Sequence, residues 1–353
     1  MSDADDWMGA VAATALEWRD PDHNPRENAV KRTLEAENTF TREAVTFAVN
    51  QQMSLLTVDA LRGWLNGRRA KTSRTVGVLN AGNIPMVGLQ DLLAVVLAGH
   101  RYVGSVSSRS PALLPAFVKD LHDRLPALEA AFDAAEQVFA RSDAVIATGS
   151  DETIAWVQRQ CERYGIPERR RLIRGHSYSV AVLDGSETED DFEKLAEDAL
   201  LHEGFGCRNV ALIWAPIDMS PDPVLDAFAH FRGVFPAHEG TPGRLAMQQA
   251  FLAAVEQPHA YGEGLEFLLS RGEPEEQQSG HVRWCAYDAV EDVDRWLRSH
   301  VDEIQLVVAG PNVRPRLSAD MRLLPMGEAQ RPKLDWCPDG RDTVAFLTER
   351  IDD

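Results

Sequence analysis

A glycine-rich turn with a single cysteine stands directly before an apolar run, at HEGFGCRNVALIWAP (residues 202–216). Gly204 and Gly206 allow a sharp backbone turn and the close approach of a ligand. Residues 210–214 predict a buried strand, which places Cys207 at its entrance. A thiol on such a loop can act as a nucleophile, because its thiolate is reactive and nearby backbone N–H groups stabilise it. The alternative is a small buried cysteine that follows a turn.

The remaining cysteines give no sign of metal or disulfide chemistry. The four cysteines are widely spaced, with no CxxC pair and no Cys/His cluster. This spacing argues against structural zinc and a disulfide framework, and it fits a reducing cytoplasm. We therefore expect no metal site, and we expect three inert, buried cysteines: Cys161, Cys285 and Cys337.

The elements that position the cysteine follow an α/β pattern. From Thr75 onward, apolar runs of strand length alternate with helical patterns of 10–15 residues, which predicts βαβ units and a mostly parallel sheet. Ligands of such sheets bind at the carboxyl ends of the strands. Three polar loops fall at such ends: AGNIP (81–85), SVSSRS (105–110) and ATGSDE (147–152).

The length of 353 residues exceeds one ordinary core and predicts two domains. We expect two α/β domains, preceded by helices and followed by a tail rich in Pro, Arg and Gly. We predict a helical N-terminal segment over 1–70 and a cofactor-binding domain over 71–203. A catalytic domain that carries the cysteine follows over 204–310, and the tail, which could be an oligomerisation arm, covers 311–353.

Composition excludes several classes of function. The net charge of −19 argues against nonspecific binding to nucleic acid or anionic lipid, because like charges repel. No apolar run reaches the roughly 20 residues of a membrane span, and the acidic N-terminus is no secretory signal. We expect a cytoplasmic protein. The sequence also lacks GxGxxG, GxxxxGK[ST] and GxSxG, so a Rossmann fingerprint, a P-loop and a serine nucleophile elbow are not supported.

Three segments together resemble one family: AGNIPMVGLQDLLAVVLAGH (81–100), ATGSDET (147–153) and GFGCRNV (204–210). They are similar to the acyl-CoA reductase family typified by LuxC of bacterial luminescence, a branch of the aldehyde dehydrogenase superfamily. The tail PMGEAQRPKLDWCPDGRDTVAFL (325–347) resembles the end of shorter LuxC-like chains. The resemblance runs from Thr75 to the C-terminus and implies an aldehyde-dehydrogenase-like fold.

The resemblance also implies roles for particular residues. Cys207 matches the superfamily's nucleophile. Asn83 matches the asparagine that forms the oxyanion hole together with the backbone N–H of the cysteine; the alternative is a turn-forming asparagine. A TGS turn matches the place where the cofactor's pyrophosphate meets a helix N-terminus, although Ser150 could simply be a helix N-cap. This turn consists of Thr148, Gly149 and Ser150.

Two departures from the superfamily pattern bear on the chemistry. Ser105 and Ser108 lie where the superfamily contacts the adenosine ribose, and many members have lysine and glutamate there. Because Ser108 stands in place of that glutamate, no carboxylate at this position repels a 2′-phosphate, and Arg109 is the next residue. This favours NADPH as the cofactor, and NADH stays possible. At LIRG (172–175), hydrolysing relatives have ELGG, whose glutamate activates the deacylating water. Ile173 replaces it here, which agrees with an acyl group exchanged with CoA.

The resemblance therefore implies reduction of acyl-CoA to an aldehyde through a thioacyl-enzyme. His176 is a candidate proton donor, with a structural histidine as the alternative, and His202 and Glu203 are further candidates. Two other functions stay open: reduction of an acyl phosphate or acyl-AMP, and a catalytically silent paralogue that binds cofactor or a partner. LuxC-like enzymes can receive acyl groups from partner proteins, and by analogy with the superfamily we expect a homo-oligomer.

Overall fold

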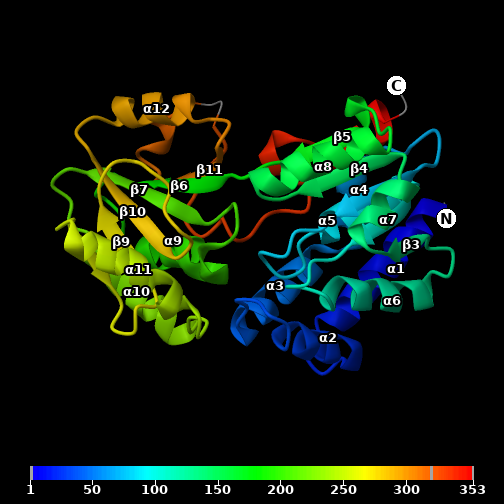
Figure 1. Ribbon diagram of the computed structural model, residues 1–353, viewed down its shortest axis with the longest axis horizontal. Coiled ribbons are helices and arrows are strands. Elements are labelled where there is room, and N and C mark those ends of the chain that lie inside the picture. Colours follow the sequence, from blue (N-terminus) through cyan, green and yellow to red (C-terminus); the bar gives the residue numbers. More distant parts are fainter. Residues whose placement is uncertain (1–2, 319–320, 352–353) are drawn as a thin grey trace. The chain divides into compact units, whose positions relative to one another are not determined.

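The computed structural model describes residues 3–318 and 321–351. The chain forms two compact units, each assembled from segments that are distant in the sequence. Each unit has its own sheet and its own helices (Figure 1), so the expected α/β fold is confirmed. Unit 1 consists of Met1–Asn38, Val45–His176 and Lys333–Asp353, and unit 2 consists of Thr39–Ala44 and Ser177–Pro332.

Unit 1 contains a five-stranded sheet made of β1 (Thr75–Leu79), β2 (Arg101–Ser105), β3 (Ala130–Phe132), β4 (Ala144–Thr148) and β5 (Arg171–Arg174). All neighbouring strands are parallel, in the order β3-β2-β1-β4-β5. The central strand β1 is therefore flanked by β2 and β4. The loops after these three strands leave the sheet at the same edge.

The helices of unit 1 are α1 (Asp3–Trp18), α2 (Asn24–Leu34), α3 (Arg42–Leu55, which begins in unit 2), α4 (Val58–Leu65), α5 (Leu89–Leu97), α6 (Leu113–Arg124), α7 (Ala135–Arg141), α8 (Asp151–Arg163) and α13 (Thr343–Ala345). α7 and α8 share one apolar cluster with the sheet, which includes Leu79, Val145, Phe139 and Val157. α5 is apolar on nearly every side and is correspondingly buried.

The N-terminal helices pack into unit 1 through Trp18. Its side chain is fully buried, lies edge-on to Phe117 at 5.4 Å, and donates a hydrogen bond to Asp120 Oδ2 at 2.7 Å. Arg26 of α2 donates to the Trp18 carbonyl oxygen at 2.8 Å. Helices α1 and α2 therefore contribute to the core of unit 1.

Several elements of unit 1 differ from the sequence prediction. Pro85 suggests a helix start, since proline is common in a first turn, but α5 begins only at Leu89 because Gly88 adopts a φ of 92°. A Cβ at Gly88 would lie 1.8 Å from Asn80 Oδ1, so a side chain has no room there. The sequence prediction also missed α2, β3, α7 and β5. In α2, Pro25 suggests a break in the chain, but a proline in the first turn favours a helix start.

Unit 2 contains a seven-stranded sheet made of β6 (Tyr178–Val182), β7 (Val210–Pro216), β8 (His259–Tyr261), β9 (Leu268–Arg271), β10 (His281–Tyr287), β11 (Ile304–Ala309) and β12 (Leu323–Leu324). The order is β12-β11-β6-β7-β10-β9-β8, and only the edge pair β8–β9 is antiparallel. In Figure 1, α12 (Val290–Ser299) lies on one side of this sheet. On the other side lie α9 (Glu189–Leu200), α10 (Asp222–Val234) and α11 (Thr241–Ala254).

The boundary between the units differs from the one expected at residue 203. β6 pairs with β7 and β11, so β6 and the following α9 belong to unit 2, and the boundary falls after His176. The alternation of strands and helices did not reveal this, because apolar periodicity identifies a strand without identifying its sheet.

The tail after β12 contributes to both units. In unit 2, residues 325–330 contact α9, as described below. In unit 1, Gln90 donates to the carbonyl oxygens of Leu334 and Trp336 at 2.8 and 2.7 Å, and Arg68 pairs with Asp342 at 2.6 Å. The tail ends in α13 followed by a π-helical turn, Phe346–Arg350.

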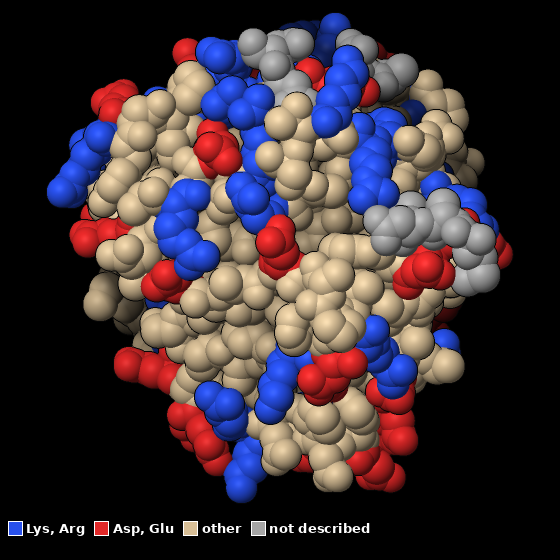
Figure 2. All heavy atoms as spheres, turned by 90° about the vertical axis from the view of Figure 1, so that its right-hand side faces the viewer, with Lys and Arg blue, Asp and Glu red and all other residues tan. Residues whose placement is uncertain are grey.

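Charged side chains of both signs are spread over the face of the molecule in Figure 2, with uncharged side chains between them. Such mixing is ordinary for a solvated surface. In residues 3–318 and 321–351, none of the helices combines the length and the apolar character that crossing a membrane requires.

Candidate active site

The polar strand ends of unit 1 meet at one edge of its sheet. The register pairs Leu79 of β1 with Ser105 of β2 and with Ala147 of β4, so these strands end side by side. The loop with Asn83, the loop after Ser105 and the TGS turn therefore leave the same edge. The structure thus brings together the residues that the sequence assigned to the cofactor and to one oxyanion donor.

The loops after β1 and β2 are packed directly against each other. A Cβ at Gly82 would lie 2.1 Å from Ser107 Oγ, so the AGNIP loop can approach only because it has a glycine there. Asn80 Nδ2 donates to the Ser105 carbonyl oxygen and to Tyr102 Oη, both at 2.8 Å. Asn80 was missed in the sequence, although an asparagine directly after a strand is a usual turn signal.

The TGS turn opens α8. Ser150 is its N-cap, and its Oγ accepts a hydrogen bond from the Thr153 N–H at 3.4 Å. The N-cap interpretation of Ser150 is thus confirmed, and its role toward a cofactor stays a prediction. Gly149 N–H donates to the Arg174 carbonyl oxygen at 3.2 Å, which fixes the turn to β5.

The other predicted residues of unit 1 lie at or near this edge. Ser105 is half-buried, and Ser108 and Arg109 are exposed. His176 is exposed just beyond β5. Ile173 lies within β5, and its side chain packs against the apolar cluster beneath α7 and α8.

The cysteine loop of unit 2 has an unusual backbone. It follows α9 through a short turn, Leu201–Gly204, and it ends where β7 begins. His202, Glu203 and Gly204 have φ values of 55°, 57° and 74°, three left-handed residues in succession. A left-handed conformation costs each non-glycine residue about 1–2 kcal/mol. Contacts of the surrounding residues must offset this cost.

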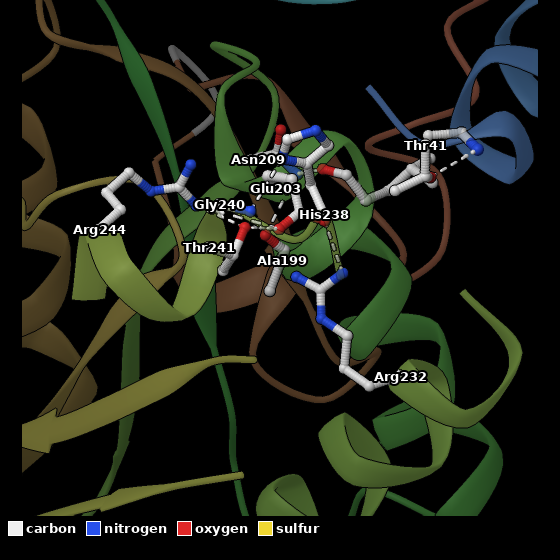
Figure 3. A network of polar contacts seen from close by, with 11 residues as sticks. Thr41, Ala199, Glu203, Asn209, Arg232, His238, Gly240, Thr241 and Arg244 are labelled. Atoms are coloured by element: carbon white, nitrogen blue, oxygen red, sulfur yellow. Dashed lines mark hydrogen bonds and ion pairs between the residues drawn. The ribbon is translucent and has the colours of Figure 1, made fainter. Parts of the chain in front are cut away.

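The Glu203 carboxylate supplies such contacts (Figure 3). It is 3% exposed, and Arg232 Nη1 of α10 donates to one oxygen at 2.8 Å. Thr241 Oγ1, at the start of α11, donates to the other oxygen, and Arg244 Nη2 lies 3.9 Å from it. The buried carboxylate thereby ties the strained turn to two helices. A paired carboxylate of this kind is a poor candidate for activating water.

Asn209 closes the same loop from its other end. Its Oδ1 accepts a hydrogen bond from the Gly206 N–H, and its Nδ2 donates to the Leu201 carbonyl oxygen, both at 2.8 Å. Between these anchors, the Arg244 guanidinium lies over the Phe205 ring at 4.6 Å. Cys207 is thus held on a loop whose two ends are fixed by buried side chains.

Gln305 of β11 contacts the cysteine itself. Its Nε2 donates to Cys207 Sγ at 3.4 Å, and only 7% of Gln305 is exposed. Ser179 Oγ of β6 donates to the Cys207 carbonyl oxygen at 3.0 Å. The Cys207 side chain is half-buried. Sequence analysis missed Gln305, whose signal is a single polar residue in the apolar run IQLVV (304–308).

The other three cysteines and His202 differ among themselves in burial and in pKa. Burial raises the pKa of Cys161 to about 11 and that of Cys285 to about 12, which agrees with inert thiols. Cys337 was expected to be buried and is half-buried instead. Burial lowers the pKa of His202 to about 4, so this histidine is neutral near pH 7. A buried neutral imidazole is a poor proton donor.

Asp198 and Arg208 hydrogen-bond to the backbone of residues 327–329, in the tail segment of unit 2. Asp198 accepts hydrogen bonds from the Gly327 and Ala329 N–H groups at 2.6 and 3.0 Å. Arg208 donates to the Ala329 and Glu328 carbonyl oxygens. Burial raises the pKa of Asp198 to about 7, against backbone hydrogen bonds that lower it. In the described part of the chain, no cluster of three metal-ligating side chains occurs.

Comparison with known proteins shows the family to which the chain belongs. The model of the family described as acyl-CoA reductase (LuxC) matches residues 2–218. The match includes the N-terminal helices, where we saw no resemblance, and it ends before the tail. None of the curated proteins compared with the sequence is significantly similar to it.

Solved structures share the fold. Aldehyde dehydrogenase 21 from Physcomitrella patens, in complex with succinate, has a TM-score of 0.70 at 12% identity, covering 99% of this chain and 85% of that chain. The aldehyde dehydrogenase of Mycobacterium tuberculosis, complexed with NAD⁺, has a TM-score of 0.65 at 15% identity, covering 90% and 76%. AldC from Pseudomonas syringae, with NAD⁺ and octanal, has a TM-score of 0.63 at 13% identity, covering 91% and 76%. The expected aldehyde-dehydrogenase-like fold is confirmed.

Glu203→Gln should lower the free energy of unfolding by about 3–5 kcal/mol, because it leaves the buried Arg232 guanidinium without its carboxylate. Urea unfolding of both proteins measures the change. Glu197→Gln is the matched control: Glu197 pairs with Arg331, which is 44% exposed, and this change should cost no more than about 1 kcal/mol. Equal losses in the two variants would contradict a special role of Glu203.

Gln305→Leu should slow alkylation of Cys207 by iodoacetamide about tenfold at neutral pH, because a hydrogen bond to a charged acceptor contributes at least about 1.5 kcal/mol. The alkylation profile should also move to higher pH. Gln330→Leu is the control, since that amide is equally buried and donates to the Asp198 carbonyl oxygen instead. An unchanged profile in Gln305→Leu, or an equal shift in Gln330→Leu, would speak against the contact.

The Asp198 carboxyl should make unfolding depend on pH. Its pKa is about 7 in the folded chain and about 4 in an unfolded one, so between these values the folded chain holds an extra proton. Its contribution to stability is therefore complete below about pH 4 and is lost as the pH rises through about 7. Between about pH 5 and 7.5, the wild type should lose about 2 kcal/mol relative to Asp198→Asn, measured by urea unfolding. Parallel pH dependences would refute this assignment.

Proposed function

Because the chain belongs to the LuxC acyl-CoA reductase family, we propose that it reduces acyl-CoA thioesters to aldehydes through a thioacyl intermediate on Cys207. The observation that carries this proposal is the half-buried Cys207 thiol, on a loop held by buried polar side chains and contacted by a buried amide donor. A nucleophile held in one position is what covalent acyl transfer requires.

In the first step, the Cys207 thiolate attacks the thioester carbonyl carbon of acyl-CoA. A bond forms between Sγ and that carbon, the bond from carbon to the CoA sulfur breaks, and CoA leaves as a thiolate that takes up a proton. Gln305 stabilises the attacking thiolate through its Nε2–H donor. The Cys207 backbone N–H is the donor that we propose for the negative oxygen, and the family pattern assigns the Asn83 amide to the same role.

In the second step, the thioacyl carbon accepts a hydride and becomes a thiohemiacetal anion. When this anion collapses, the bond between carbon and Sγ breaks, the aldehyde leaves, and Cys207 returns as a thiolate. The same donors stabilise the oxygen in both steps. His176, which is exposed on unit 1, is our candidate for supplying the proton to the departing CoA thiolate.

A nicotinamide cofactor supplies the hydride when it is bound. The polar edge of unit 1 has a suitable set of donors. The TGS turn at the N-terminus of α8 offers backbone N–H groups to a pyrophosphate, and Ser105 and Ser108 offer hydroxyls to a ribose. Arg109 offers a guanidinium to a 2′-phosphate, so we propose NADPH. The NAD⁺ complex of the Mycobacterium tuberculosis relative supports the cofactor class.

Water should attack the thioacyl-enzyme slowly. The segment LIRG (172–175) has no carboxylate where hydrolysing relatives have a glutamate, because Leu172 is buried and Ile173 packs against the apolar cluster of unit 1. The Glu203 carboxylate is paired with Arg232. The intermediate therefore has no evident base to activate water among these residues, and it awaits either hydride or CoA.

Mixing the enzyme with an acyl-CoA in the absence of NADPH should release one equivalent of CoA rapidly and little afterwards. Mass spectrometry should find the acyl group on Cys207, and adding NADPH should release aldehyde rather than fatty acid. Cys207→Ala should give no burst, because it lacks the nucleophile. Continuous CoA release with accumulating fatty acid would refute the non-hydrolytic site, and reduction of an acyl phosphate but not of acyl-CoA would refute the substrate class.

A further inference from the structure

A small cavity in unit 1 is lined mainly by arginine side chains. Its volume is about 360 Å³, and four arginines and one glutamate line it beside the buried Leu172 and Phe346. The charged residues of this arginine cavity are Arg169, Arg171, Arg341, Arg350 and Glu168. Because the whole chain has a net charge of −19, this concentration of positive charge is contrary to its general composition.

The arginine cavity lies beside β5, the outermost strand of its sheet. The short helical turn Glu168–Arg170 leads into β5, and the tail contacts both. Arg341 Nη1 donates to the Ile173 carbonyl oxygen at 2.9 Å, and Arg170 Nε donates to the Ile351 carbonyl oxygen at 3.2 Å. In Figure 1 the red end of the chain accordingly lies next to β5. Two distant segments of the chain therefore form the cavity together.

This cavity differs from the edge that we assign to the cofactor. β5 begins at Arg171, so Arg169 and Arg171 stand at its amino end. The TGS turn is fixed to the carboxyl end of β5, where the Gly149 N–H donates to the Arg174 carbonyl oxygen. None of the three residues of that turn lines the arginine cavity.

Arginines elsewhere on the surface pair with carboxylates, whereas those of the cavity do not. Exposed arginines that form ion pairs include Arg62, Arg141, Arg295, Arg298 and Arg316. Among the residues that the structure describes, none of the four arginines of the cavity forms an ion pair, and Asp342, next to Arg341, pairs with Arg68 instead. Like charges that lie together repel each other. An anion in the cavity relieves this repulsion and accepts charge-assisted hydrogen bonds.

Two of the guanidinium groups are already fixed by backbone carbonyl groups. Arg171 Nε donates to the Ile166 carbonyl oxygen at 2.8 Å, and Arg341 is held by the Ile173 carbonyl oxygen. A guanidinium group has five N–H donors, so both arginines keep donors for a ligand. Because these side chains are ordered before a ligand arrives, binding costs less conformational entropy.

Charge and size indicate the chemical class of the ligand. Guanidinium groups match phosphate oxygens with paired N–H donors, and several of them together suit an anion with several charges. A volume of about 360 Å³ lies at the lower end of the range of about 300–1,000 Å³ for small-molecule sites. The cavity is therefore suited to a small polyphosphate.

We propose that the arginine cavity binds a small anion with two or more phosphate groups, which bridges the tail to the segment before β5. These phosphates belong either to a free metabolite or to one of the nucleotides, CoA and NADPH. The site is defined without reference to the reaction at Cys207, so its test needs no catalysis.

Isothermal titration calorimetry of the full chain with inorganic pyrophosphate should show saturable binding, which added salt weakens. Arg169→Gln and Arg350→Gln should each weaken this binding about tenfold, because each change removes a charged hydrogen-bond donor. Both side chains are exposed, so the melting temperature without pyrophosphate should stay near that of the wild type. Arg32→Gln is the matched control: Arg32 is exposed on α2, outside the cavity, and the change removes the same charge.

Competition identifies the source of the phosphates. Saturating CoA or NADPH should displace pyrophosphate from the arginine cavity if its own phosphates bind there, and Arg350→Gln should then bind that nucleotide about tenfold more weakly. If neither displaces pyrophosphate, the ligand is a free phosphorylated metabolite. A wild type without saturable pyrophosphate binding would overturn the proposal. So would undiminished binding in Arg169→Gln and Arg350→Gln, or an equal loss in Arg32→Gln.

Discussion

A buried carboxylate holds the reactive loop of this protein in place. Glu203 stands in a left-handed turn that costs free energy, and its side chain meets Arg232, Thr241 and Arg244, which come from two different helices. Removing a charge from water is expensive, so such a group persists only when its partners are fixed. The positions of α10 and α11 and the course of the backbone before Cys207 are therefore interdependent.

Sequence reasoning succeeded where the signal was local. The strand β1, the cysteine turn and the N-cap at Ser150 follow from apolar runs and from the conformations that glycine and serine favour. It failed where a contact with a distant segment determines the role of a residue. Gln305 is 98 positions from Cys207, and no local pattern shows that a polar side chain in one strand faces a thiol in another loop.

The same reasoning explains the errors of detail. Helix α5 begins only at Leu89 because Gly88 adopts a left-handed backbone conformation, which the apolar periodicity does not reveal. β6 belongs to the sheet of unit 2 because it pairs with β7 and β11, and its amino-acid composition does not reveal which strands it pairs with. His202 and Glu203 attract attention as a potential acid and base by residue type alone, whereas burial makes one neutral and pairs the other.

The discontinuity of both units has a consequence for their synthesis. Asp198 hydrogen-bonds to Gly327, which lies 129 positions later in the chain. In unit 1, the ring of His100 hydrogen-bonds to the carbonyl oxygen of Leu347, which lies 247 positions later. Neither unit can complete these buried polar contacts until residues 327–347 have left the ribosome. The nascent protein must therefore remain partly open until this segment is available, with its sheets already able to form and the tail segment packing onto each of them last.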